Sequence, residues 1–137
     1  MKHPIFALAA TAALIAASGP AAAQDDLLGV WRNPKNSVHV DIRPCGASAC
    51  GVVVWASQKA REDARRGSGR ELIGMQLFQN FTRASDEWRG KVFVPDLNRT
   101  LAGAARVVDD NHLEAKGCAL GFFCKSQVWT RVTQSAS

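Results

Sequence analysis

The sequence predicts an all-β protein, an antiparallel up-and-down barrel of about eight strands. Residues 38–43 alternate strictly between apolar and polar side chains, which is typical of a strand with one buried face. Short β-type runs recur roughly every 14 residues and are bounded by turn residues, as at 33–36 and 109–111. A barrel is preferred to an open sheet because closure removes exposed strand edges.

The expected strands leave no room for long crossover connections. In chain order they are residues 28–32, 38–43, 51–55, 75–81, 91–94, 100–108, 112–115 and 125–132. Residues 57–70 break this rhythm, because they lack apolar alternation and are dense in charge. Ser57 can cap a short helix, and Gly67 and Gly69 would end it. We therefore expect a short helix or loop at 57–70, over the barrel mouth.

Length and composition limit the classes of protein to consider. The chain has 137 residues, of which 47% are hydrophobic and 21% charged, enough for one ordinary globular domain. The net charge is +5, from 17 Lys and Arg residues against 12 Asp and Glu residues. The mean hydropathy of -0.10 is typical neither of a disordered nor of a membrane-embedded chain. Fibres, coiled coils and multidomain proteins are excluded.

The first residues have the pattern of a secretory signal peptide. Lys2 precedes an apolar run at 5–17, and three alanines at 21–23 form a small-residue cleavage site. The apolar run is too short for a transmembrane anchor, which needs about 20 residues. We expect cleavage after residue 23, which leaves one domain at 24–137 with a charge of +4, since Lys2 is removed. The expected location is the periplasm or the outside of a bacterial cell, where disulfides persist.

The four cysteines bracket two expected hairpins. Cys45 and Cys50 flank one turn, and Cys118 and Cys124 flank another. On the chain-entropy model a local bridge contributes roughly 2 kcal/mol and a cross-pairing roughly 4 kcal/mol. Geometry favours the local pairs, because cysteines on opposite arms of a hairpin lie at the separation that a disulfide needs. Zinc is not expected, since its paired cysteines are usually separated by two to four residues and the compartment is oxidising.

No catalytic motif is present, and we expect neither an enzyme nor a cofactor. The sequence has no G-x-S-x-G, HExxH, GxGxxG or P-loop spacing. His39 lies on the polar phase of a strand and His112 follows a polar turn, so both are expected at the surface. Asp41, Glu71 and Glu114 are single carboxylates that only the fold can bring together.

The charged stretch contains five basic residues, which are Lys59, Arg61, Arg65, Arg66 and Arg70. Glu62 and Asp63 partly neutralise them. The simplest interpretation is a solvated segment that keeps the protein soluble. The functional alternative is attraction to anionic lipid headgroups, to lipopolysaccharide or to an acidic ligand. Nucleic acid is not an expected partner, because no aromatic residues interleave with the basic ones.

Residues near both ends of the domain predict how the barrel closes. Gly29 and Trp31 lie in the first expected strand, and Trp129 and Arg131 in the last. First and last strands are neighbours in a closed barrel, so the guanidinium of Arg131 can lie over the indole of Trp31 and donate to a backbone carbonyl. This contact would plug one end of the barrel and contribute about 1 to 2 kcal/mol.

An ordered set of motifs resembles the bacterial family named domain of unknown function 2147. The motifs are Gly29-Val30-Trp31, Cys45, residues 50–55, residues 88–95, Gly117-Cys118 and residues 124–131. The resemblance implies a lipocalin-like barrel of the calycin type, exported by bacteria, with a role in binding apolar ligands. It supplies no catalytic residues. After Pro95 the family usually has a Gly turn and then a Tyr, where this chain has Asn98 and Leu101.

Two functions follow from these features. The first is a periplasmic barrel that binds or carries a small hydrophobic or amphipathic molecule. The candidate ligand residues are Trp55, Met75, Leu77, Phe78, Phe81 and Phe93, which would alternatively fill the interior. The second is a packed structural module that docks an envelope protein or an anionic membrane surface through residues 59–70.

Overall fold

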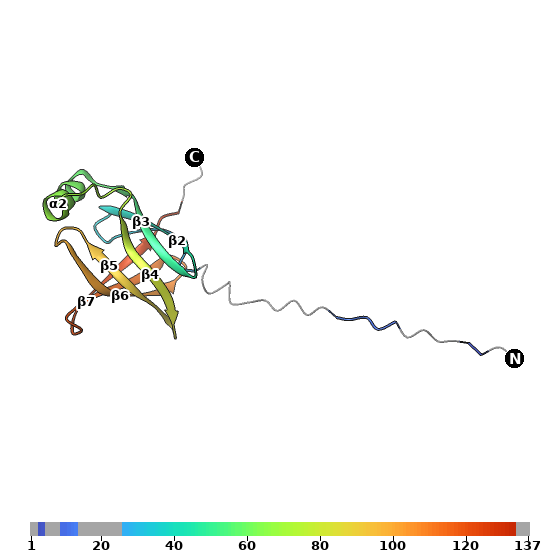
Figure 1. Ribbon diagram of the computed structural model, residues 1–137. Coiled ribbons are helices and arrows are strands. Elements are labelled where there is room, and N and C mark those ends of the chain that lie inside the picture. The colour runs from blue at the N-terminus through green and yellow to red at the C-terminus, as the bar shows by residue number, and fades with distance from the viewer. Residues whose placement is uncertain (1–2, 5–8, 14–25, 134–137) are drawn as a thin grey trace.

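A computed structural model describes residues 3–4, 9–13 and 26–133. The barrel is closed, and each strand pairs with its neighbours in chain order (Figure 1). This confirms the predicted all-β, eight-stranded antiparallel barrel. The predicted signal peptide at 1–23 and its cleavage site lie largely outside the described residues. The elements are β1 Gly29–Arg32, β2 Val38–Cys45, β3 Ser48–Ala56, α2 Gln58–Ser68, β4 Gln76–Ala84, β5 Glu87–Val94, β6 Arg99–Asp109, β7 His112–Ala119 and β8 Phe123–Arg131.

The alternation of β2 decides which of its side chains enter the core. Val40 and Ile42 are buried, whereas His39, Asp41 and Arg43 face outward. The inner residues pack with Trp31, Leu113 and other apolar residues from every side of the barrel. The hydrophobic pattern therefore determines both the register of the strand and its inward face.

Two glycines let an aromatic ring approach the inner wall closely. Gly90 of β5 pairs with Gly103 of β6, and a Cβ on Gly103 would lie 2.9 Å from Cζ of Phe81. A Cβ on Gly90 would lie 2.6 Å from the backbone oxygen of Gln79 and 2.7 Å from the Phe81 ring. Side chains at either position would displace Phe81, which is buried in the core.

Helix α2 occupies the charged stretch, as predicted. The hydroxyl of Ser57 accepts a hydrogen bond from the Ala60 amide, and Gly69 ends the helix in the left-handed conformation. The expectation that Gly67 also ends the helix is wrong. Gly67 lies inside the last turn, where a Cβ would be 2.3 Å from the carbonyl oxygen of Pro95. Glycine is needed there because α2 touches the β5–β6 turn.

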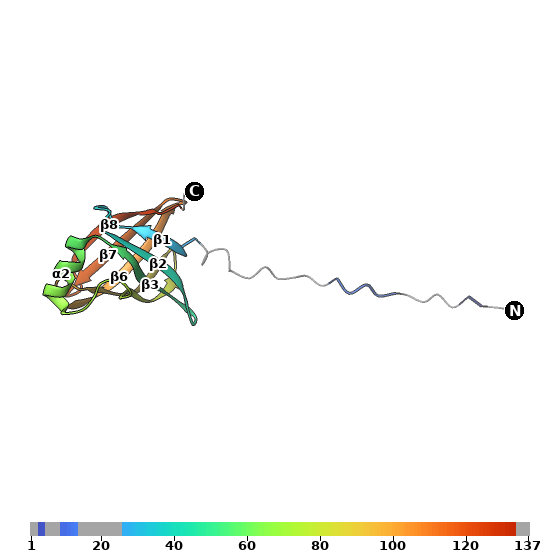
Figure 2. The ribbon, with the colours of Figure 1, turned by 90° about the horizontal axis from the view of Figure 1, so that it is seen from above.

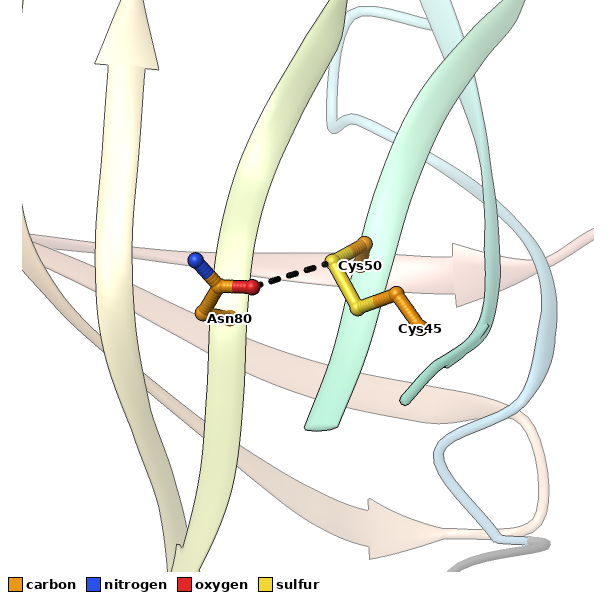
Figure 3. The surroundings of a disulfide bond; sticks show 3 residues. All are labelled: Cys45, Cys50 and Asn80. Atoms are coloured by element: carbon orange, nitrogen blue, oxygen red, sulfur yellow. Dashed lines mark hydrogen bonds between the residues drawn. A yellow bond between two sulfur atoms is a disulfide. The ribbon is translucent and has the colours of Figure 1, made fainter. Parts of the chain in front are cut away.

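Both disulfides have the local pairing. Cys45 pairs with Cys50 across the β2–β3 turn, and Cys118 with Cys124 across the β7–β8 turn. The side-chain oxygen of Asn80 on β4 lies 3.7 Å from the Cys50 sulfur (Figure 3). Each bridge therefore fastens one hairpin, and the two bridges lie at opposite ends of the barrel.

Arg131 closes the barrel at the end where the described domain begins. The guanidinium carbon lies 4.1 Å from the centre of the Trp31 ring, which is fully buried. Its three nitrogens donate to the carbonyls of Leu28 at 2.8 Å, Asp26 at 2.7 Å and Asp110 at 2.7 Å. Gly29 has a φ of 120°, and a Cβ there would lie 2.7 Å from the guanidinium. One planar cation thus joins the N-terminal segment, β8 and the β6–β7 turn.

We predict that Arg131→Lys destabilises the fold by about 1 to 2 kcal/mol, because an ammonium cannot serve three separated carbonyls and stack on an indole. Urea unfolding followed by tryptophan fluorescence measures the loss. Arg106→Lys is the control, since Arg106 makes only an exposed ion pair with Glu114 at 3.7 Å. Equal stability of the two variants would contradict this role of Arg131.

Candidate functional site: the open inner face of β7 and β8

The six residues expected to contact a ligand do not lie together. Four of them, Met75, Leu77, Phe78 and Phe81, are buried in the core. Trp55 lies on the outer face, which corrects the expectation that it lines the interior. Phe93 follows the outward alternation of β5 but is partly buried and packs against the core. Trp55 is 43% exposed and its ring centroid lies 4.6 Å from that of His39, while the Arg70 guanidinium lies 5.1 Å from the Phe93 ring centroid.

The interior is filled in the half of the barrel nearest Arg131. An internal cavity there is lined by seven apolar residues, Leu27, Ile42, Ala49, Phe78, Phe81, Ala105 and Leu113. Its volume of about 10 Å³ is at the lower limit of what one water molecule occupies. A ligand with several carbon atoms has no space here without moving Phe78 or Phe81.

The inner face of β8 changes character along the strand. Trp129 is buried in the core, and the strand alternation places Gln127, Lys125 and Phe123 on the same face. These three side chains are nevertheless exposed. The reason is that β1 pairs with β8 only from Trp31 to Arg131 and from Arg32 to Thr130, so no strand covers the other side of β8 beyond this seam.

A row of four paired residues crosses the inner wall and ends at Lys125. Gly90 pairs with Gly103, Gly103 with Gly117, and Gly117 with Lys125. Phe81 covers the first two glycines, but a Cβ on Gly117 would meet only Cδ1 of Leu101, at 3.5 Å. The row therefore leaves an accessible strip of backbone at Gly117, next to a lysine.

The chemistry of this inner face is mostly apolar with one cation. Lys125 makes no ion pair with any described residue. The Gln127 side-chain oxygen accepts a hydrogen bond from Trp129 Nε1 at 3.2 Å, which leaves the amide NH₂ free to donate outward. The alternation of β6 and β7 places Leu101 and Ala119 on the same inner face. An apolar chain with an anionic end matches this arrangement.

A wider cleft lies at the Arg131 end of the barrel and has a different lining. It measures about 640 Å³ and is bounded by Val107, Val108 and seven polar or charged residues, Asp26, Arg83, Asp86, Asp109, Asp110, Asn111 and Arg131. The guanidinium of Arg131 already donates to three carbonyls here. We do not assign the ligand to this cleft, because its carboxylates and committed arginine suit neither an apolar chain nor an anion.

The histidines lie on the surface and far from a catalytic arrangement. Partial burial, and then the charge of Arg32, lower the pKa of His39, so its imidazole is neutral at pH 7. His112 Nδ1 lies 2.8 Å from Asp109. Hydrogen bonds from the Asn111 amide and from His112 lower the pKa of Asp109. Among the residues that the structure describes, no three His, Cys, Asp or Glu side chains gather as metal ligands.

The basic segment neutralises itself to a large degree. Lys59 and Arg66 pair with Asp63, while Arg61 and Arg65 pair with Glu71. Hydrogen bonds from Arg61 and then Arg65 lower the pKa of Glu71 to about 2. Of the five basic residues predicted to attract anions, Arg70 alone makes no ion pair with a described carboxylate, and it lies over Phe93. The segment therefore has little free charge to offer a partner.

Comparison with known proteins identifies the family. Residues 29–131 match the model of an uncharacterized protein conserved in bacteria, DUF2147. This chain belongs to the DUF2147 family. No curated protein matches it. A solved structure described as "Protein HP1028 from the human pathogen Helicobacter pylori belongs to the lipocalin family" resembles this DUF2147 barrel with a TM-score of 0.65 and 14% identity, over 79% of this chain and 84% of that chain. The likeness establishes a lipocalin-like fold.

Sequence reasoning missed the open inner face of this DUF2147 protein. Lys125 and Gln127 belong to an expected strand and Gly117 lies just after another, but none of the three was singled out for ligand contact. Three glycines that recur at intervals of 13 and 14 residues, Gly90, Gly103 and Gly117, were the available signal. Their alignment depends on strand register, which a single sequence does not specify.

We predict that α2 loosens as the pH falls from about 4.5 towards 2. The folded state lowers the pKa of Glu71 from 4.5 to about 2, so its two ion pairs stabilise the fold above the unfolded pKa and are lost as the carboxylate protonates. Amide hydrogen exchange of residues 58–68 should accelerate over this range. In Glu71→Gln the exchange should be faster at neutral pH and change less with acid. An unchanged pH profile in that variant would contradict the assignment.

Proposed function

We propose that this protein binds a small amphipathic molecule, with an apolar chain and an anionic end, on the open inner face of β7 and β8. The observation that carries the proposal is the placement of Lys125, an exposed cation that pairs with no described carboxylate, on the inner side of the barrel beside the bare backbone of Gly117. A lipocalin-like barrel is a frame in which other proteins hold one small ligand.

The apolar part of the ligand would lie along the wall between β6 and β8. Leu101, Gly117 and Ala119 offer carbon surface there, and Trp129 with Phe78 closes the bottom, their ring centroids 5.4 Å apart. Each methylene that leaves water contributes about 0.8 kcal/mol. A chain of several methylenes therefore supplies most of the binding free energy. The lysine selects ligands whose polar head group is negatively charged.

We further propose that residues 1–23 are a signal peptide and that residues 24–137 act in the periplasm or outside the cell. The two disulfides support this, because such bridges persist in oxidising compartments. No helix among the described residues is long and apolar enough to cross a membrane. The docking alternative through residues 59–70 has less support, since most of that charge is paired within the protein.

We predict that Lys125→Gln weakens the binding of a fluorescent fatty acid by about tenfold, because a charge-assisted contact is lost. The experiment is a fluorescence titration of the chain without residues 1–23. Lys116→Gln is the matched control, since Lys116 lies one residue from Gly117 but faces outward. Equal effects of the two substitutions, or the absence of saturable binding to the unsubstituted protein, would contradict the proposal.

A second variant tests the place of the apolar chain. Gly117→Val should fill the strip beside Leu101 and abolish binding, while the fold keeps its stability because a Cβ at this position meets no atom closer than 3.5 Å. The control is Ser126→Val, which places the same valine side chain on the outer face of β8. Thermal unfolding confirms that both variants fold. Retained affinity in Gly117→Val would place the ligand elsewhere.

A further inference from the structure

The tip of the β7–β8 hairpin exposes three large apolar side chains together. Leu120 is 81% exposed, Phe122 71% and Phe123 64%, and the two aromatic ring centroids lie 4.5 Å apart. The hairpin projects from the barrel on the side where α2 also lies (Figure 1; Figure 2 shows β7 and β8 from above). We call Leu120, Phe122 and Phe123 the apolar tip. Clusters of exposed apolar residues mark interaction surfaces in monomeric proteins.

The backbone of the tip is closed by a disulfide and has a residue that is not optimal for the turn. Leu120 has a φ of 56° and Gly121 a φ of 79°, so a leucine occupies a left-handed position. Asn or Gly takes this conformation at lower cost. The Cys118–Cys124 bridge ties the two strands directly behind the tip. The hairpin therefore holds an apolar side chain in water at a cost to its own stability.

The surroundings of the tip carry free positive charge. Arg99, Lys116 and Lys125 lie on the three neighbouring strand ends, and none is paired with a described carboxylate. Asp96, on the adjacent β5–β6 turn next to the exposed Leu97, is an opposing charge. The net excess of cations favours an anionic partner.

The size of the apolar tip argues against a stable protein partner or a second copy. Its three side chains offer on the order of 500 Å², below the roughly 800 Å² per partner that a stable complex buries. A bilayer interface has no such minimum, since single apolar and aromatic side chains partition there and nearby cations add attraction. We propose that the apolar tip inserts into the interface of an anionic bilayer, with Arg99 and Lys116 among the headgroups.

The two proposals can be tested separately, because Leu120 and Phe122 belong to the turn, whereas Phe123 also lies on the inner face of β8. Docking of the apolar tip would bring the open end of the barrel to the membrane surface. An amphipathic molecule leaving the bilayer would meet Lys125 without crossing bulk water.

The test is sedimentation of the chain without residues 1–23, which contains every strand of the barrel, with vesicles of phosphatidylcholine alone or mixed with phosphatidylglycerol. The unsubstituted protein should bind the anionic vesicles and release at high salt. Leu120→Asn should lower the partition coefficient about tenfold while raising Tm, because Asn suits the left-handed turn. A loss of binding with higher stability cannot be attributed to unfolding.

Phe122→Ser should lower vesicle binding as Leu120→Asn does, and Val108→Ser should not. Val108 is the control because it is also exposed, by 55%, but lies at the other end of the barrel. Uptake of the fluorescent fatty acid from solution should be unchanged in both tip variants, which separates this proposal from the ligand site. Vesicle binding that survives in both tip variants, or that Val108→Ser reduces equally, would overturn the proposal. Loss of fatty-acid uptake in the tip variants would also overturn it.

Discussion

The short seam between the first and last strands is the constraint on which the rest of the structure depends. β1 has four residues and pairs with β8 at two positions. Such a seam leaves little ladder to hold a barrel shut, and Arg131 compensates by binding three carbonyls and stacking on Trp31. The same shortness leaves the rest of β8 without a strand on that side. The short pairing of β1 with β8 therefore explains both why Arg131 is needed to close one end of the barrel and why the inner face of β8 is exposed at the other end.

The two halves of the interior differ for this reason. Near the seam, Trp31, Leu113, Phe78 and Phe81 fill the core, and the cavity beside Phe78 and Phe81 measures about 10 Å³. Glycines on β5 and β6 permit this filling, because Phe81 lies against the bare wall. Beyond the seam, the same row of residues continues as Gly117 and Lys125 with nothing above it but Leu101. The fold thus combines a solid core, which supplies stability, with an open face, which can bind.

The sequence predicted the parts of the structure that depend on local patterns. Alternation located β2, turn residues bounded the strands, and hairpin spacing paired the cysteines. The contact of Arg131 with Trp31 was predicted because closing the barrel makes the first and last strands neighbours. The ligand candidates were less successful, because large apolar residues such as Trp55 and Phe93 occur on both faces of a strand, and only the register assigns the face. For the same reason the alignment of three glycines with Lys125 was not visible, since it depends on pairing across four strands.

The most direct test of the account is an amide NMR titration of the isotopically labelled protein with a medium-chain fatty acid. Binding at the open inner face predicts concentration-dependent shifts of Gly117, Lys125, Gln127 and the Trp129 indole, with little change at residues 109–111. Shifts confined to the cleft around Arg131, or no saturable shifts at all, would contradict the assignment of the ligand to β7 and β8.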